Sequence, residues 1–157
     1  MKYRHTLSLL AMLPITLLLN ACGDPDDPEA RIRQFIETAE LRVENREFTE
    51  IMGMISGDYA DSRGNDKFAI VGILRAYFLR HKSIHLFIRI GEIEFLRPDH
   101  ATVSIQAFMA GTPFSQDEGL RIPDSDFHKF DFELIEDGGD WQLARAEWTR
   151  AASAQIF

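Results

Sequence analysis

The chain has one cysteine, Cys22, among its 157 residues. A single cysteine excludes an internal disulfide bond and a cysteine-rich metal site. Basic residues are also scarce, with 17 Lys and Arg against 25 Asp and Glu and a formal net charge of −8. Because binding to nucleic acid depends on neutralising phosphates with Lys and Arg, we expect no nucleic-acid partner.

Motifs of common enzyme and metal sites are absent from the sequence. There is no glycine-rich phosphate loop, no Gly-x-Ser-x-Gly motif and no Cys/His pair. The histidines after residue 21 show no close pair with metal-ligand spacing on one element; they are His81, His85, His100 and His128. We therefore expect no metal and no cofactor, and the sequence assigns no residue a catalytic role.

The N-terminal segment has the layout of an export signal. Basic residues, Lys2 and Arg4, precede an apolar run from Leu7 to Leu19. As a helix this run would extend about 20 Å, short of the ~30 Å hydrocarbon core, which disfavours a membrane-spanning anchor. The segment ends in Leu19-Asn20-Ala21-Cys22, which resembles the lipobox of bacterial lipoproteins. A plain secretory signal cleaved near Ala21 is the alternative.

The lipobox resemblance implies a modification and a location. In that family a signal peptidase removes the leader, here residues 1–21, and the cysteine thiol, here that of Cys22, receives a diacylglyceryl group. The mature chain would begin with an acidic tether, residues 22–27, and would contact the lipid bilayer through acylated Cys22. Gly23 stands where an aspartate often signals inner-membrane retention, so we expect a lipid-anchored protein that faces the periplasm, at the outer membrane rather than the inner membrane.

The mature chain is strongly acidic. The leader contains Lys2 and Arg4 but no acidic residue, which leaves 15 basic and 25 acidic residues and a formal charge of −10. Anionic lipid repels a body of this charge, so we expect the acyl chains to be its contact with the membrane.

Apolar residues recur at helical spacing in three segments, which predict helices at about 28–45, 48–55 and 66–82. Asp27 can cap the first helix, with Pro28 at its first position. Asn65 or Asp66 can cap the third. His81 lies in the last turn of the third helix, where a cation suits the helix dipole, and this placement is a sufficient structural reason for it.

From Ser83 onward the apolar period changes to two, which predicts strands. Strands are expected at about 83–96, 102–109, 127–135 and 141–149, with turns at 97–100 and 137–140. In the first strand Ile84, Leu86, Ile88 and Ile90 form the more convincing core face. Gly91 indicates a bulge.

Three helices followed by four antiparallel strands form an α+β plan. This order resembles the NTF2-like (SnoaL-like) superfamily over residues 28–150, with 151–157 as a C-terminal tail. The resemblance is carried by Ile55-Ser56-Gly57-Asp58-Tyr59 after the second helix and by the hairpin from Phe130 to Leu143. It implies a cone, in which a curved sheet wraps three helices around one pocket. A cystatin-like sheet on one helix is the rival, but it leaves two helices unexplained.

The resemblance also implies candidate pocket residues, because enzymes of this superfamily place Asp, Tyr or His in the cone. The candidates here are Tyr59, Tyr77, His85, Arg89 and His128. If the face that contains Ile84 packs on the core, however, His85 and Arg89 on the opposite face of the strand point away from the pocket. Tyr59 is alternatively a buried phenol that fixes the loop after the second helix. Within that loop we expect Arg63 to pair with Asp61 or Asp66.

The sequence favours a non-catalytic binding or assembly module. Its partner would be a small apolar ligand, another protein, or a second copy that pairs through the sheet. Phe87, Phe108 and Trp148 are candidates for that dimer surface. The alternative is a small-molecule isomerase, cyclase or hydrolase that uses His85, His128 or Tyr59. Side chains that converge in an enclosed pocket would favour the enzyme, and a pocket filled by Phe and Ile would exclude it.

Overall fold

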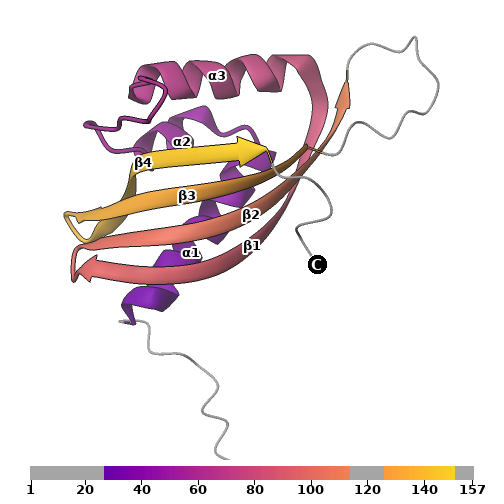
Figure 1. Ribbon diagram of the computed structural model, residues 1–157. Coiled ribbons are helices and arrows are strands. Elements are labelled where there is room, and N and C mark those ends of the chain that lie inside the picture. The colour runs from indigo at the N-terminus through magenta and orange to yellow at the C-terminus, as the bar shows by residue number, and fades with distance from the viewer. Residues whose placement is uncertain (1–26, 114–125, 151–157) are drawn as a thin grey trace, which may run out of the picture.

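The computed structural model describes residues 27–113 and 126–150. The leader, Cys22, most of the tether and the tail at 151–157 lie outside the described residues. Three helices come first in the chain, and four strands follow them (Figure 1). The helices are α1 (Pro28–Glu44), α2 (Phe48–Gly53) and α3 (Lys67–Arg80), and the strands are β1 (His81–Arg97), β2 (His100–Pro113), β3 (Asp126–Asp137) and β4 (Asp140–Arg150).

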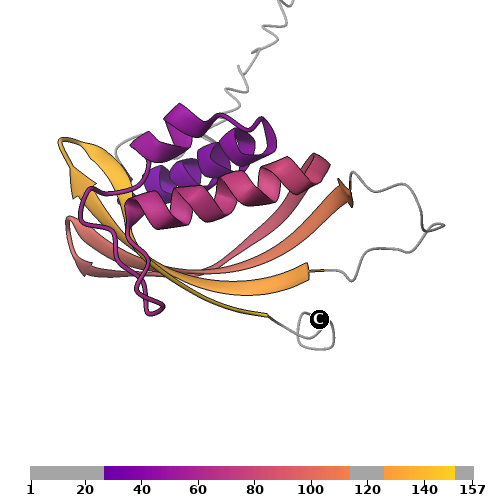
Figure 2. The ribbon, with the colours of Figure 1, turned by 90° about the horizontal axis from the view of Figure 1, so that it is seen from above.

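The four strands form one antiparallel sheet in the order β1-β2-β3-β4. The sheet is strongly curved, and the three helices lie together on one side of it (Figure 2). Each strand pairs with its neighbour in the chain. Short turns at 98–99 and 138–139 join β1 to β2 and β3 to β4. The predicted α+β cone is confirmed.

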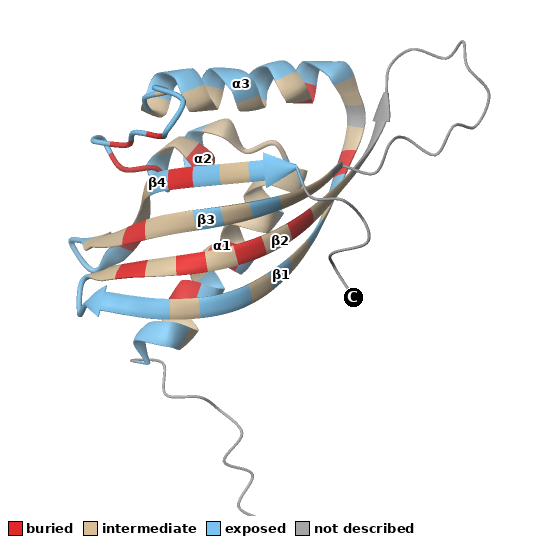
Figure 3. Ribbon diagram, viewed as in Figure 1, coloured by how far each residue is buried: buried red, intermediate tan, exposed pale blue. Residues whose placement is uncertain are grey.

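The sheet has an inner face that packs on the helices and an outer face turned away from them. Ile105 and Leu134 on the inner face are buried together with Ile32 and Ile36 of α1. Buried residues are spread along β2 in particular (Figure 3). Ile84, predicted to face the core, is only 3% exposed. The predicted core face of β1 is therefore confirmed.

The bend in β1 is centred on Gly91. The register with β2 shifts between Ile90 and Ile93, as expected for a bulge. A Cβ atom at Gly91 would lie 2.5 Å from the Oγ atom of Ser104, so only glycine fits there without a shift. The predicted bulge is confirmed.

The helix boundaries follow the capping residues. The side chain of Asp27 accepts a hydrogen bond from the backbone N–H of Glu29, and that of Asp66 accepts one from the N–H of Ala69. The third helix ends at Arg80, two residues before the predicted boundary, because His81 already has extended backbone and pairs with Pro113 of β2.

The segment after α2 is held against the edge of the sheet. The N–H of Leu143 donates to the carbonyl of Met54 at 2.9 Å, and the N–H of Ser56 donates to the carbonyl of Leu143 at 3.0 Å. Ile55 thus forms a parallel bridge with β4. These bonds end α2 at Gly53, earlier than predicted, since residues 54–56 pair with a strand.

The loop at 57–66 is organised by Asp61, which is only 7% exposed. Its carboxylate accepts bonds from the backbone N–H groups of Arg63 and Asn65 and from the Asn65 side-chain amide, each at 2.8 Å. Burial would raise the pKa of Asp61, but these hydrogen bonds outweigh it, and the pKa lies below its ordinary value. The guanidinium of Arg63 instead lies 4.2 Å from the ring of Trp148, which corrects the predicted ion pair with Asp61 or Asp66.

Candidate functional site

A cavity of about 340 Å³ lies between the helices and the inner face of the sheet. All three helices and all four strands contribute to its wall. Most lining side chains are aliphatic or aromatic, among them Val43, Ile51, Leu74, Ile88, Ile105 and Phe132. The cone is therefore an open apolar pocket and is not filled by its Phe and Ile side chains.

Polar side chains in the cavity wall are Glu40, Tyr59, Tyr77 and His128. Three of these four are among the residues predicted from the sequence. His85 and Arg89, the two other candidates, are exposed on the outer face of β1 and do not line the cavity. Strand alternation explains this outcome, because Leu86 and Ile88 take the inward positions.

Tyr59 lies at the β4 side of the cavity and is only 3% exposed. The next residue, Ala60, donates its N–H to the carbonyl of Ala144, which fixes the backbone beside β4. Within the described part of the chain the Tyr59 hydroxyl has no hydrogen-bond partner. Burial raises the pKa of Tyr59 to about 12, with a further rise from Asp61 and an opposing effect of Arg145. The phenol thus stays protonated and presents a donor.

Glu40 is the polar residue of the cavity wall that was not predicted from the sequence. It lies on α1 and is half-buried. Burial raises the pKa of Glu40 above its ordinary value of 4.5, and the negative charges of Glu44 and Glu37 raise it further. A signal was available in the sequence, because Glu40 follows the buried Ile36 by four residues and shares its helix face.

We predict that Glu40→Gln raises the melting temperature at pH 7. The raised pKa of Glu40 means that the folded chain holds this proton more tightly, so stability falls as the pH rises above 4.5. The amide removes this loss, and its advantage is expected to vanish below pH 4, where both side chains are neutral. Thermal unfolding of the variant and the wild-type chain from pH 3.5 to pH 8 measures this difference in melting temperature. The matched control is Glu37→Gln, an exposed change on the same helix, which should give a smaller gain. Equal gains from both variants would contradict burial as the main cause.

Tyr77 and His128 come from opposite walls of the cavity. The ring of Tyr77 on α3 stacks on His81 with centroids 4.2 Å apart, and Nδ1 of His81 lies 3.0 Å from the Tyr77 carbonyl oxygen. These contacts agree with a structural role for His81. His128 on β3 pairs with Ala107 of β2, and its ring lies 5.9 Å from that of Phe130.

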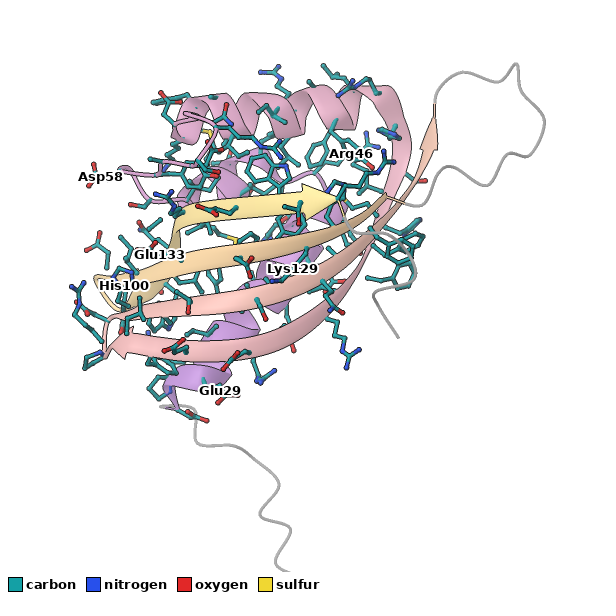
Figure 4. All side chains as sticks on the ribbon, viewed as in Figure 1. Glu29, Arg46, Asp58, His100, Lys129 and Glu133 are labelled. Atoms are coloured by element: carbon teal, nitrogen blue, oxygen red, sulfur yellow. The ribbon has the colours of Figure 1, made fainter. Side chains whose placement is uncertain are left out.

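Within residues 27–113 and 126–150, no three His, Cys, Asp or Glu side chains gather in a way that could hold a metal ion. His100 illustrates the arrangement found instead. Its Nε2 atom lies 2.6 Å from Glu133, and its Nδ1 atom lies 3.0 Å from the guanidinium of Arg97 (Figure 4). This polar network ties the β1–β2 turn to β3, on the outside of the cone.

Comparison with known proteins identifies the fold. No family model and no curated protein sequence matches the chain. Among solved structures, a proposed scytalone dehydratase from Novosphingobium aromaticivorans superposes with a TM-score of 0.69 at 13% identity, covering 79% of this chain and 84% of that one. A ketosteroid isomerase-like protein from Erwinia carotovora atroseptica gives 0.64 at 13% identity over 81% and 98%. The chain has the NTF2-like fold.

A third NTF2-like neighbour is the hexachlorocyclohexane dehydrochlorinase LinA type 2, with a TM-score of 0.60 and 12% identity over 80% of this chain and 89% of that one. At identities of this size the likeness concerns the fold alone. The activities named for these neighbours are theirs.

On the outer face of the NTF2-like sheet, aromatic rings form a row across three strands. Phe87 is 63% exposed, and its ring lies 5.8 Å from that of Phe108, which in turn lies 4.7 Å from Phe127. Trp148 is not part of this row. It lines the cavity, because a register shift between β3 and β4 reverses which positions of β4 face inward, so the prediction that Trp148 belongs to an outer dimer surface was wrong.

Proposed function

We propose that this protein is a lipid-anchored, periplasm-facing binding protein whose cone holds a small apolar molecule with one neutral hydrogen-bond acceptor. The observation that carries the proposal is the apolar cavity of about 340 Å³ lined in part by Tyr59, whose buried hydroxyl has no hydrogen-bond partner in the described residues. Pockets that bind small molecules combine a mainly apolar lining with a few placed polar groups. A hydroxyl buried without a partner costs stability, and a ligand that accepts a hydrogen bond from it would recover that cost.

The charges around the cavity narrow the ligand class. Glu40 lies in the wall, and Asp61 raises the pKa of Tyr59 from nearby. Both carboxyl groups oppose a second negative charge in this weakly solvated space. We therefore propose a neutral ligand, such as an aromatic or alicyclic ketone, rather than a carboxylate or a sulfonate.

The anchor in the proposal is acylated Cys22, which follows from the lipobox resemblance. No helix within the described ranges 27–113 and 126–150 is long and apolar enough to cross a membrane. The tether of residues 22–27 would extend at most about 20 Å, which keeps the cone close to the bilayer. Gly23 after the cysteine supports the outer membrane over the inner one.

Pairing of two copies through the outer face of the sheet is part of the same proposal. The aromatic row of Phe87, Phe108 and Phe127 supports it, because exposed apolar patches mark interaction surfaces.

The test uses a neutral fluorescent ketone, 6-propionyl-2-dimethylaminonaphthalene, titrated into the purified lipoprotein in detergent. Binding in the cone is expected to shift its emission to the blue and to saturate at one molecule per chain. Tyr59→Phe should weaken this binding by about 5- to 10-fold, the value of one hydrogen bond. Because the Tyr59 hydroxyl makes no protein hydrogen bond in the described residues, Tyr59→Phe should not lower the melting temperature.

One control compound and two outcomes define the failure of this proposal. The control compound 2-dimethylaminonaphthalene, which lacks the propionyl group, should bind equally to the wild-type chain and to Tyr59→Phe. If the ketone does not saturate on the wild-type chain, or if Tyr59→Phe binds it as tightly, the proposed ligand class is wrong.

A second function, an isomerase, cyclase or hydrolase, is favoured by one observation. The raised pKa of Glu40 in an apolar wall suits a general base, since such groups work best when their pKa approaches the working pH. Incubation of the ketone with the protein in D₂O tests this function. Deuterium uptake next to the carbonyl that is lost in Glu40→Gln would support it, and no uptake above the rate in buffer would exclude this activity.

A further inference from the structure

The outward side of α3 is apolar and uncovered. Phe68 and Leu79 are 74% and 73% exposed, and Gly72 and Ala76 between them are exposed as well. The spacing 68, 72, 76 and 79 places these four residues in one line along the helix. Figure 3 shows α3 as exposed or intermediate along nearly all of its length, and Phe78 is the residue of this helix that is fully buried.

The charge of this region differs from that of the whole chain. From Lys67 to Gly91 there is no Asp or Glu, while five Lys and Arg occur, although the chain as a whole carries −8. On α3 itself, Arg75 and Arg80 are exposed and lie on either side of the apolar line. The acidic character of the protein is therefore concentrated elsewhere, and α3 presents an apolar stripe between two arginines.

This combination is typical of a helix that lies in a membrane interface. Such helices place aromatic and aliphatic side chains at the boundary of the acyl chains, and their Lys and Arg side chains reach the phosphates beside it. A soluble helix that is apolar on both sides would instead be buried, and α3 is not buried. Within a lone chain in water, the apolar surfaces of Phe68 and Leu79 would remain in contact with solvent, which is unfavourable.

We propose that α3 lies flat on the surface of the membrane that holds the acylated Cys22, with Phe68, Leu79 and the small residues between them facing the lipid and with Arg75 and Arg80 at anionic headgroups. This inference rests on the anchor of the proposed function. The tether leads in sequence into α1, and α1 lies on the same side of the sheet as α3 (Figure 2).

A second copy of the chain fits this face less well than a lipid surface does. Two α3 helices in contact would bring the Arg75 and Arg80 side chains of both copies together, and like charges across an interface oppose association. An anionic bilayer supplies the opposite charge. The repulsion expected between the acidic body and anionic lipid would thus not act at α3, which among the helices of the described residues is the one without an acidic residue.

Docking of α3 also brings the cavity close to the lipid. Ile70, Val71, Leu74 and Tyr77 on the other side of α3 line the cavity wall. In this arrangement one helix separates the apolar pocket from the membrane. An apolar ligand would enter the pocket from the membrane.

The test places an environment-sensitive fluorophore on α3 in the full lipoprotein. Leu79→Cys, labelled with a nitrobenzoxadiazole group, is reconstituted into vesicles of phosphatidylcholine alone or mixed with phosphatidylglycerol. Emission is expected to shift to the blue in the mixed vesicles. A label at Glu94→Cys, an exposed position on β1, should stay water-like in both. Because Leu79 and Glu94 are exposed, neither change should disturb the fold.

Arg75→Gln and Arg80→Gln together should lower the lipid-bound fraction of the label on residue 79 by roughly 5-fold for each arginine. Water-like emission from residue 79 in both kinds of vesicle would overturn the proposal. A blue shift that depends on protein concentration and not on phosphatidylglycerol would overturn it too, in favour of contact between copies. The chain without an introduced cysteine should take no label, because the Cys22 thiol is acylated; labelling of that chain would show that the anchor, rather than the docking helix, is wrong.

Discussion

Ala107→Phe is expected to abolish binding of the ketone probe to the cone. Ala107 lies on the inner face of β2, pairs with Ile88 and His128, and lines the cavity. Its exposure is only 7%, so a phenyl ring at this position has no route to solvent and must enter the cavity. The ring would occupy part of a space of about 340 Å³, and the loss of affinity is expected to be at least about 100-fold.

The fold should tolerate this change better than a core substitution of the same size. Overpacking a filled core costs typically ~1–3 kcal/mol, but here the added ring enters space that no protein atom occupies. We expect a circular dichroism spectrum like that of the wild-type chain and a melting temperature that is unchanged or higher.

The matched control for Ala107→Phe is Lys129→Phe, which adds the same ring to the outer face of the sheet. Lys129 is exposed on β3, and only a surface ion pair with Asp131 is lost (Figure 4). Titration of the probe into both variants should therefore show binding by Lys129→Phe and none by Ala107→Phe. Retained binding by Ala107→Phe would place the probe outside the cone and contradict the proposed site.

The order and type of the elements could be predicted from the sequence because most local patterns agree with the final arrangement. The period of two in β1 placed Ile84 on the core side, and the same alternation placed His85 and Arg89 outside. Gly91 stood out as the one glycine in that strand, and it lies at the bulge. Such signals are local, and no distant contact overrides them.

The cavity wall was harder to predict because it depends on relations between elements. Trp148 was assigned to the wrong face, since the shift in register opposite Glu133 and Leu134 is set by the pairing of two strands and has no mark in the sequence of β4. Glu40 was missed because an acidic residue on a long helix is usually solvated. Glu40 nevertheless lies in the cavity wall, which is formed together with the strands and the other helices.

Cys22→Ser is expected to remove the acyl chains completely. In the lipoprotein reading, the thiol of Cys22 is the only group in the chain that can carry the diacylglyceryl modification, and the leader is cut after this step. The wild-type protein should therefore have the mass of residues 22–157 plus acyl groups and should partition into the detergent phase. The variant should keep residues 1–21 and carry no lipid, as intact-mass spectrometry would show.

The control for the anchor is Gly23→Ser, which changes the neighbouring residue and leaves the thiol in place, so its acylation should be normal. One acyl chain gives only weak, reversible membrane binding, whereas two or more hold a protein stably, so Cys22→Ser should remove the whole lipid part of the membrane attachment. Retention of leader and absence of acyl groups in the wild-type protein would contradict the lipobox interpretation. A mature wild-type chain that begins near Ala21 without lipid would show a plain secretory signal, and α3 would then be the remaining candidate for contact with the membrane.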